Sequence, residues 1–82
     1  MEQLIDIADA ITTLIKLRVD RPEAVAVETV PANEGFSLRI SVDPADMGKV
    51  IGKQGRTARS LRVIVTAMGM ASKQRISLDI QE

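Results

Sequence analysis

The sequence contains no histidine, no cysteine, no tryptophan and no tyrosine, and its one aromatic residue is Phe36. Without histidine the chain lacks the commonest general base and metal ligand. Without cysteine it has neither a disulfide framework nor a thiolate metal site. Carboxylates remain, but no pair of them stands in a recognisable catalytic motif. These absences predict a protein that is not an enzyme and that uses no metal and no cofactor.

Long apolar runs are also missing. No stretch approaches the roughly 20 residues of a membrane-spanning helix, and the first six residues carry acids where a signal peptide has its basic region. The 82 residues can form one small domain, and no repeat, linker or low-complexity tract divides them. We therefore expect a single domain over residues 1–82, located in the cytoplasm and without membrane contact.

Charge is balanced in total but not along the chain. Eleven cations and eleven acids give a net charge of zero, and residues 1–47 carry four cations against nine acids. Residues 48–62, here called the basic segment, carry five cations and no acid. Those cations are Lys49, Lys53, Arg56, Arg59 and Arg62. Such a concentration of cations predicts an anionic partner, which the neutral total conceals.

The basic segment contains a four-residue loop, Gly52-Lys53-Gln54-Gly55, here called the glycine loop. Glycine at both ends lets the backbone turn sharply and leaves no Cβ to hold a ligand away. The helix that follows presents unpaired N–H groups and its positive dipole end to the loop, which favours an anion. With Lys53 in the loop and Arg56 just after it, the favoured anion is a phosphodiester backbone.

Two other interpretations compete with this one. A nucleotide P-loop requires G-x-x-x-x-G-K-[ST] after a strand. Here Gly48 and Gly52 are one residue too close, and Gln54 stands where the magnesium ligand would be, so the P-loop is rejected. A plain corner between two helices, with Gly52 as a C-cap, fits the loop alone about as well. The surrounding elements decide between the corner and an anion clamp.

Apolar periodicity predicts the element order α-β-β-α-α-β. The expected helices are 2–18, 44–51 and 56–70, and the expected strands are 24–30, 36–42 and 75–80, with a turn at 31–35. A two-helix crossover favours parallel pairing of the second and third strands, and the first two strands form a hairpin, so the second strand is central. We therefore expect an α+β fold with a three-stranded mixed sheet and all three helices on one face.

In this context the sequence resembles a KH domain of type II. The family signature is an apolar pair, then Gly-x-x-Gly, then apolar residues at intervals of three. In this chain it is matched by Val50, Ile51, Gly52, Gly55, Ala58 and Leu61. The longer string over residues 48–58 is similar to that of small bacterial stand-alone KH proteins of the KhpA type, and the likeness covers essentially the whole chain. Ala58 departs from the larger isoleucine or valine usual at its position, which could widen or shift the groove.

The resemblance implies binding of single-stranded RNA, with about four nucleotides in a narrow groove and the glycine loop against the sugar–phosphate backbone. It also implies a role as an RNA chaperone or post-transcriptional regulator. Val50 or Ile51, together with the second strand, would form an apolar floor for the bases. The expected RNA-binding residues are Gly48, Lys49, Val50, Ile51, Gly52, Lys53, Gln54, Gly55, Arg56 and Arg59.

Two alternatives stay open. A protein-interaction adaptor of the same fold would have no need of Lys53 between two glycines. Single-stranded DNA could replace RNA, because nothing in the sequence reports on a 2′-hydroxyl group. Neither the RNA target nor the base preference follows from the sequence.

The helix over 56–70 has a second apolar face. Its expected core face consists of Ala58, Leu61, Ile64, Val65 and Met68. Val63, Ala67 and Met70 lie on the opposite side, where we expect a partner. The partner would be a second copy of the chain or another KH protein, and the resemblance suggests a larger Jag-type RNA-binding protein for the second case. A dimer would offset the modest affinity of one domain that lacks aromatic stacking.

Overall fold

The computed structural model describes residues 2–81 and the side chains of residues 6–81. The helices and strands are α1 (Glu2–Lys16), β1 (Ala26–Ala32), β2 (Gly35–Ser41), α2 (Met47–Ile51), α3 (Arg56–Ala71) and β3 (Ile76–Ile80). Short 3-10 turns, Pro22–Ala24, Pro44–Asp46 and Lys53–Gly55, precede β1, α2 and α3. The predicted order α-β-β-α-α-β is confirmed.

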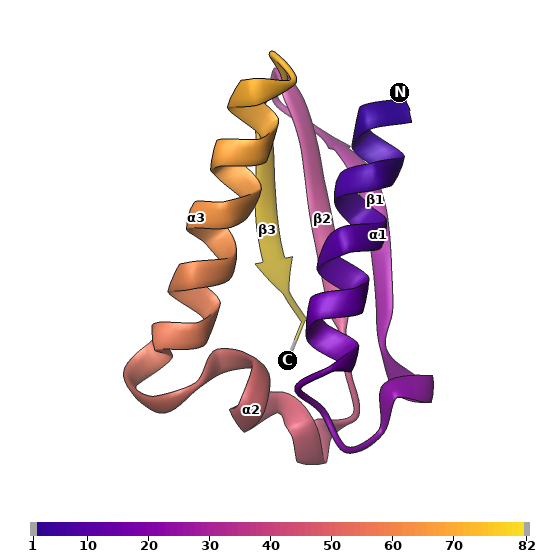
Figure 1. The fold of residues 1–82 in the computed structure, drawn as a ribbon, viewed down its shortest axis with the longest axis vertical. Helices are drawn as coiled ribbons and strands as arrows, with labels where there is room; N and C mark the ends of the chain where they lie inside the picture. Colours follow the sequence, from indigo (N-terminus) through magenta and orange to yellow (C-terminus); the bar gives the residue numbers. More distant parts are fainter. Residues whose placement is uncertain (1, 82) are drawn as a thin grey trace.

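The sheet has the strand order β1-β2-β3. β2 pairs antiparallel with β1 and parallel with β3, so that Leu38 lies opposite both Thr29 and Leu78. The central position of the second strand is therefore confirmed. α1 and α3 lie side by side over one face of the sheet, and the short α2 lies at one end of the same layer (Figure 1).

The hairpin differs from the expected boundaries. β1 continues through Pro31 to Ala32, and the connection shrinks to Asn33 and Glu34, with Glu34 at φ 61°. Proline cannot donate a ladder hydrogen bond, but β1 is an edge strand and tolerates it. The turn predicted over 31–35 is therefore wrong at Pro31 and Ala32, which belong to β1, and at Gly35, which begins β2.

The core lies between the two long helices and the sheet. Its buried members are Ile7, Ile11, Ile15, Leu38, Ile40, Val50, Leu61, Val65, Ile76 and Leu78. On the opposite face of the sheet Arg39, Ser77 and Asp79 are polar and exposed, as the alternation in the strands predicts. None of the helices within residues 2–81 has both the length and the apolar character needed to cross a membrane.

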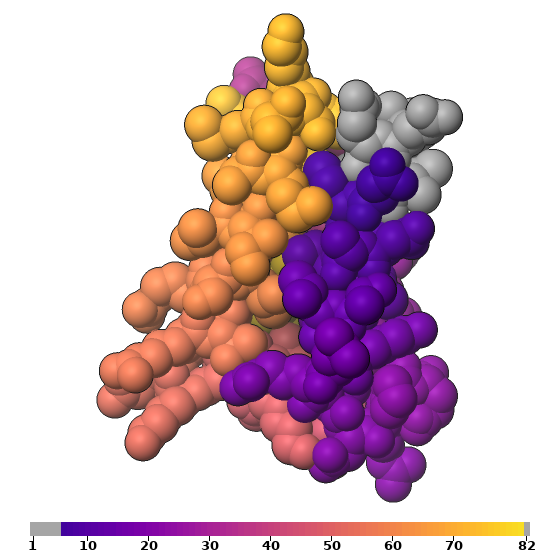
Figure 2. Space-filling view, viewed as in Figure 1, coloured from indigo at the N-terminus to yellow at the C-terminus, as the bar shows by residue number. Residues whose placement is uncertain are grey.

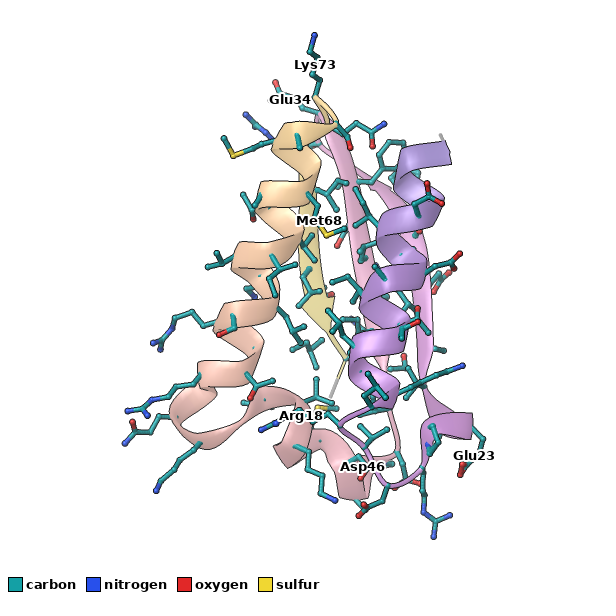
Figure 3. The ribbon with its side chains drawn as sticks, in the orientation of Figure 1. Arg18, Glu23, Glu34, Asp46, Met68 and Lys73 are labelled. Atoms are coloured by element: carbon teal, nitrogen blue, oxygen red, sulfur yellow. The ribbon has the colours of Figure 1, made fainter. Side chains whose placement is uncertain are left out.

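One expected core position of α3 is wrong. Ile64 is 40% exposed, whereas Gly69, which was not among the expected core positions, is buried in the helix. A Cβ at Gly69 would lie 2.8 Å from the backbone oxygen of Gln74, because the chain that leads into β3 passes close to this helix turn. α3 therefore presents Gly69 to β3 and leaves Ile64 at the margin of the core. Met68 points into the space between α3 and α1 (Figure 3).

Candidate nucleic-acid interface

The glycine loop is a tight turn between α2 and α3. Gly52 ends α2 at φ 80° and ψ 171°, a backbone region that essentially only glycine occupies. Its N–H donates to the oxygen of Gly48 at 2.8 Å, and the N–H of Gly55 donates to the oxygen of Gly52 at 3.1 Å. Gly55 has left-handed backbone angles, φ 73° and ψ 14°. The two glycines thus reverse the chain within four residues, as the loop prediction requires.

Gln54 is the strained residue of the loop. It adopts φ 58° and ψ 26°, a left-handed conformation that is unfavourable for a residue with a Cβ. Its Oε1 accepts a hydrogen bond from Nη2 of Arg56 at 3.2 Å. Lys53, Gln54 and Arg56 are all exposed. The loop therefore presents a cation, an amide and a guanidinium group to solvent at the same point.

The start of α3 is open to an anion. Gly55 is the N-cap, no side chain caps the helix, and no acid lies in its first turn. The 16 residues of α3 give the helix a full dipole whose positive end meets the loop. The N–H groups of Gly55 and Arg56 already donate to the oxygens of Gly52 and Lys53, so the helix dipole and the cations Lys53 and Arg56 are what favour a negatively charged ligand here.

A groove of about 330 Å³ runs beside the loop. It is lined by Ile51, Gly55, Ala58, Arg59, Arg62 and Ile80. Its apolar part comes from α2, α3 and β3, and two guanidinium groups stand along it. The small side chain at position 58 is 4% exposed and forms part of the wall without filling it.

The expectation that the second strand forms the groove floor is wrong. Leu38 and Ile40 of β2 have no exposed surface, because β2 is the central strand and the helices cover it. The strand that reaches the groove is the edge strand β3, through Ile80. Of the two apolar candidates on α2, Ile51 lines the groove, whereas Val50 is 1% exposed and belongs to the core. Val50 is therefore not placed to touch RNA.

The five cations of the basic segment are not equivalent. Lys53, Arg56, Arg59 and Arg62 are exposed and form no ion pair with any residue in the range 6–81. Lys49 instead pairs with Asp20 and lies 4.0 Å from Oδ1 of Asp46. Its charge is thus compensated within the protein, contrary to its expected role as a free cation at the RNA surface. Four cations remain for an anionic ligand.

Gly48 occupies a different environment from Gly52. It is exposed on α2, and a Cβ built on it would meet no atom within 4 Å. The fold itself therefore does not require glycine at position 48. The residue exposes helix backbone without a side chain, which a ligand could approach closely. Figure 2 shows the long side chains of the salmon-coloured region, residues near the start of α3, projecting from one lower corner of the molecule.

Three residues that matter here are absent from the RNA-binding residues expected from the sequence. Arg62, named from the sequence only as a cation of the basic segment, and Ile80 line the groove, and Asp46 is buried just before α2. Arg62 could have been found, because it follows Arg59 by three residues and lies on a neighbouring strip of the same helix. No comparable local signal marks the burial of Asp46. Among residues 6–81, no three histidine, cysteine or acidic side chains gather where they could hold a metal ion.

Comparisons with known proteins identify the family of this chain. The family model for the KhpA/KhpB KH domain matches residues 8–80. The RNA-binding protein KhpA of Caldanaerobacter subterraneus subsp. tengcongensis is 39% identical over 72 residues, which cover 88% of this chain and 96% of that protein. The RNA-binding protein KhpA of Aquifex aeolicus is 42% identical over 74 residues, covering 90% and 94%. That of Halalkalibacterium halodurans is 48% identical over 62 residues, covering 76% and 82%.

A more distant likeness concerns the fold alone. A crystal structure of Aquifex aeolicus Era bound to GDP and aluminium fluoride superposes with a TM-score of 0.58 at 16% sequence identity, over 90% of this chain and 29% of that one. The family match spans nearly the whole chain, and the relatives are matched over most of their own length. The chain therefore belongs to the KhpA/KhpB family of KH-domain proteins.

Proposed function

We propose that this chain binds single-stranded RNA in the groove beside the glycine loop. The observation that carries the proposal is the coincidence of three features at one place: a loop without a Cβ atom at either end, a helix start without a side-chain cap, and four cations without acidic partners among residues 6–81. The curated relatives described above are named RNA-binding proteins, which supports the same ligand. The protein acts in the cytoplasm as an RNA chaperone or post-transcriptional regulator.

We propose separate roles for the residues of the loop and the groove. The backbone of Gly52 to Gly55, with Lys53 and Arg56, holds the phosphates. Ile51 and Ile80 give the bases an apolar surface across the groove. Arg59 and Arg62 provide guanidinium planes on which bases can stack, which matters because the chain has no aromatic residue in the groove. Gly48, expected from the sequence to bind RNA, remains a proposed contact to the RNA backbone, because the helix surface at this position is exposed and carries no side chain.

We further propose that the exposed apolar side of α3 binds a second KH domain. Val63 is 64% exposed and Met70 is 73% exposed, and Ala67 lies between them on the same side. A hollow of about 400 Å³ on this side is lined by these three residues with Arg59, Arg62 and Thr66. The partner is a second copy of the chain or a Jag-type protein. Two linked grooves raise the affinity for long RNA beyond that of either groove alone.

The proposed function is tested by titrating fluorescently labelled single-stranded RNA of four to twelve nucleotides and following anisotropy. DNA of the same sequence shows whether the 2′-hydroxyl contributes. Crosslinking and sequencing of RNA bound in cells, with a glycine-loop variant as the control, then identifies the targets. An adaptor without RNA function would show no binding in the titration and no enrichment over the variant in cells.

A further inference from the structure

The connection that follows α1 holds both ends of the segment that carries α2. Before α2, the two carboxylate oxygens of Asp46 accept the N–H groups of Asp20 at 3.1 Å and Arg21 at 3.0 Å. At the other end, Nε of Arg18 donates to the backbone oxygen of Lys49 at 2.9 Å. Arg18 thus reaches from the end of α1 toward α2 across 31 positions of sequence (Figure 3).

α2 needs such contacts because it has only five residues. A helix of this length has essentially no stability of its own in water. The oxygen of Lys49 belongs to the last turn, whose carbonyl groups have no partner within the helix. Gly52 turns the chain away directly afterwards, so that no backbone N–H outside the helix donates to this oxygen among the described residues. Arg18 therefore satisfies the orphan carbonyl that lies three residues before the glycine loop.

Lys49 and Arg18 each reach from their own segment to the other. The side chain of Lys49, a member of the basic segment, turns toward Asp20 in the connection after α1. The side chain of Arg18, which lies outside the basic segment, turns toward α2. Arg18 forms no ion pair among residues 6–81, so its guanidinium group is held at α2 by the carbonyl and not by an acid.

We propose that Arg18 is a positioning residue of the RNA clamp. By holding the last turn of α2, it fixes the point at which Gly52 turns, and with it the direction in which the side chain of Lys53 faces a phosphate. Arg18 acts through the oxygen of Lys49 and does not touch the RNA. Its effect on RNA rests on the proposed function, whereas its effect on the loop is a property of the free protein.

The test compares Arg18→Lys and Arg18→Gln with Lys16→Gln. Arg18→Lys keeps the charge but loses the planar guanidinium that places an Nε–H on the carbonyl. Lys16 is the matched control, since it is an exposed cation in the last turn of α1 with no ion pair or side-chain hydrogen bond among residues 6–81. The measurements are amide chemical shifts and hydrogen exchange of the glycine loop in the free protein, the Kd for an eight-nucleotide RNA, and its salt dependence.

Both Arg18 variants should shift the amides of Gly52 and Lys53 and speed their hydrogen exchange. Both should weaken RNA binding about 3- to 10-fold, the loss of one hydrogen bond to a charged donor at an exposed site. The slope of log K against log salt should stay unchanged, because no phosphate contact is lost. Lys16→Gln should leave the loop amides and the Kd as in the wild type.

Three results would overturn the proposal. Loop amides that do not respond to either Arg18 variant would show that the hydrogen bond does not position the loop. If Arg18→Lys has the loop amides and the Kd of the wild type while Arg18→Gln does not, the charge of Arg18 matters and its guanidinium hydrogen bond does not. A salt slope that becomes shallower by about 0.7 would make Arg18 a direct phosphate contact. If the wild type itself binds no RNA, the proposed function fails, while the amide comparison still decides the role of Arg18 in the loop.

Discussion

A Cβ atom on Gly52 would lie 2.3 Å from Oγ1 of Thr57 and 2.8 Å from its backbone nitrogen. The glycine loop therefore closes directly onto the first turn of α3, and the contact leaves no room for any side chain. Gly55, by contrast, has open space around it and is special only in its positive φ. The two glycines of one motif are thus required for different physical reasons.

Alanine substitutions at three glycines should separate these reasons. Gly52→Ala combines the overlap with Thr57 and a glycine-only backbone conformation, so we expect a loss of about 2–4 kcal/mol in the free energy of unfolding. Gly55→Ala should cost about 1–2 kcal/mol, the price of a left-handed conformation. Gly48→Ala lies in a helix with free space and should be neutral or stabilising by up to about 1 kcal/mol. Urea denaturation measures all three.

Gly48→Ala also tests the RNA path. Because the folded protein tolerates this methyl group, weaker RNA binding by a stable Gly48→Ala variant would place the RNA backbone against α2. We expect a loss of affinity of about 3-fold or more if the backbone passes there, since a methyl group prevents close approach. Unchanged affinity would remove Gly48 from the RNA-binding surface.

Asp46 should be more important for stability than its neighbour Asp43. Asp46 is 1% exposed and accepts two backbone N–H groups, so Asp46→Ala leaves both without a partner and should cost about 2–4 kcal/mol. Asp43 caps the N–H of Ala45 at an exposed site, and Asp43→Ala should cost about 1 kcal/mol. Equal losses in chemical denaturation would contradict the role given to Asp46.

The outer side of α3 can be tested by a single charge. Ala67→Glu places a carboxylate between Val63 and Met70, where its burial against a partner would be unfavourable. We expect a folded monomer by light scattering, weaker binding to long RNA and little change for a four-nucleotide RNA. A wild-type protein that stays monomeric at high micromolar concentration would exclude the homodimer and leave a heterologous KH partner.

The local features of the site could be predicted because their causes are local. Positive φ angles and a tight turn require glycine at Gly52 and Gly55, and that spacing is visible in the sequence. The element order follows from apolar periodicity in the same way. From the sequence we expect the second strand to form the groove floor, whereas the predicted sheet order itself makes the third strand the edge strand that follows the helix crossover.

The remaining features depend on contacts between distant parts of the chain. Lys49 looks like any other cation of the basic segment, and only its pairing with Asp20, 29 positions earlier, removes its charge from the ligand surface. Asp46 has the appearance of a helix-start acid, and its burial follows from the path of the connection after α1. Apolar spacing cannot tell Val50 from Ile51, because both lie near the core side of a short helix.

Salt dependence reports how many cations meet the RNA. With three to five phosphate contacts, log K should fall with log salt at a slope of about −2 to −3.5. Charge removal at Arg56 or Arg59, for example Arg59→Gln, should make the slope shallower by about 0.7. Because Lys49 is already paired, Lys49→Gln should change the slope by less than either of these. Equal changes at all three positions would mean that the pairing of Lys49 does not persist in the complex.

The most direct test of the RNA clamp is the double substitution of Lys53 and Gln54 to aspartate, measured by anisotropy on the same RNA. Both side chains are exposed, and aspartate tolerates the left-handed angles of position 54, so the protein should fold with nearly unchanged stability. Lys73→Asp is the control, because Lys73 is an exposed loop cation with φ 58° at the opposite end of the molecule (Figure 3). The clamp predicts that the double variant loses RNA binding by at least about 30-fold while Lys73→Asp changes it by less than about 3-fold. Wild-type affinity in a folded double variant would contradict the clamp.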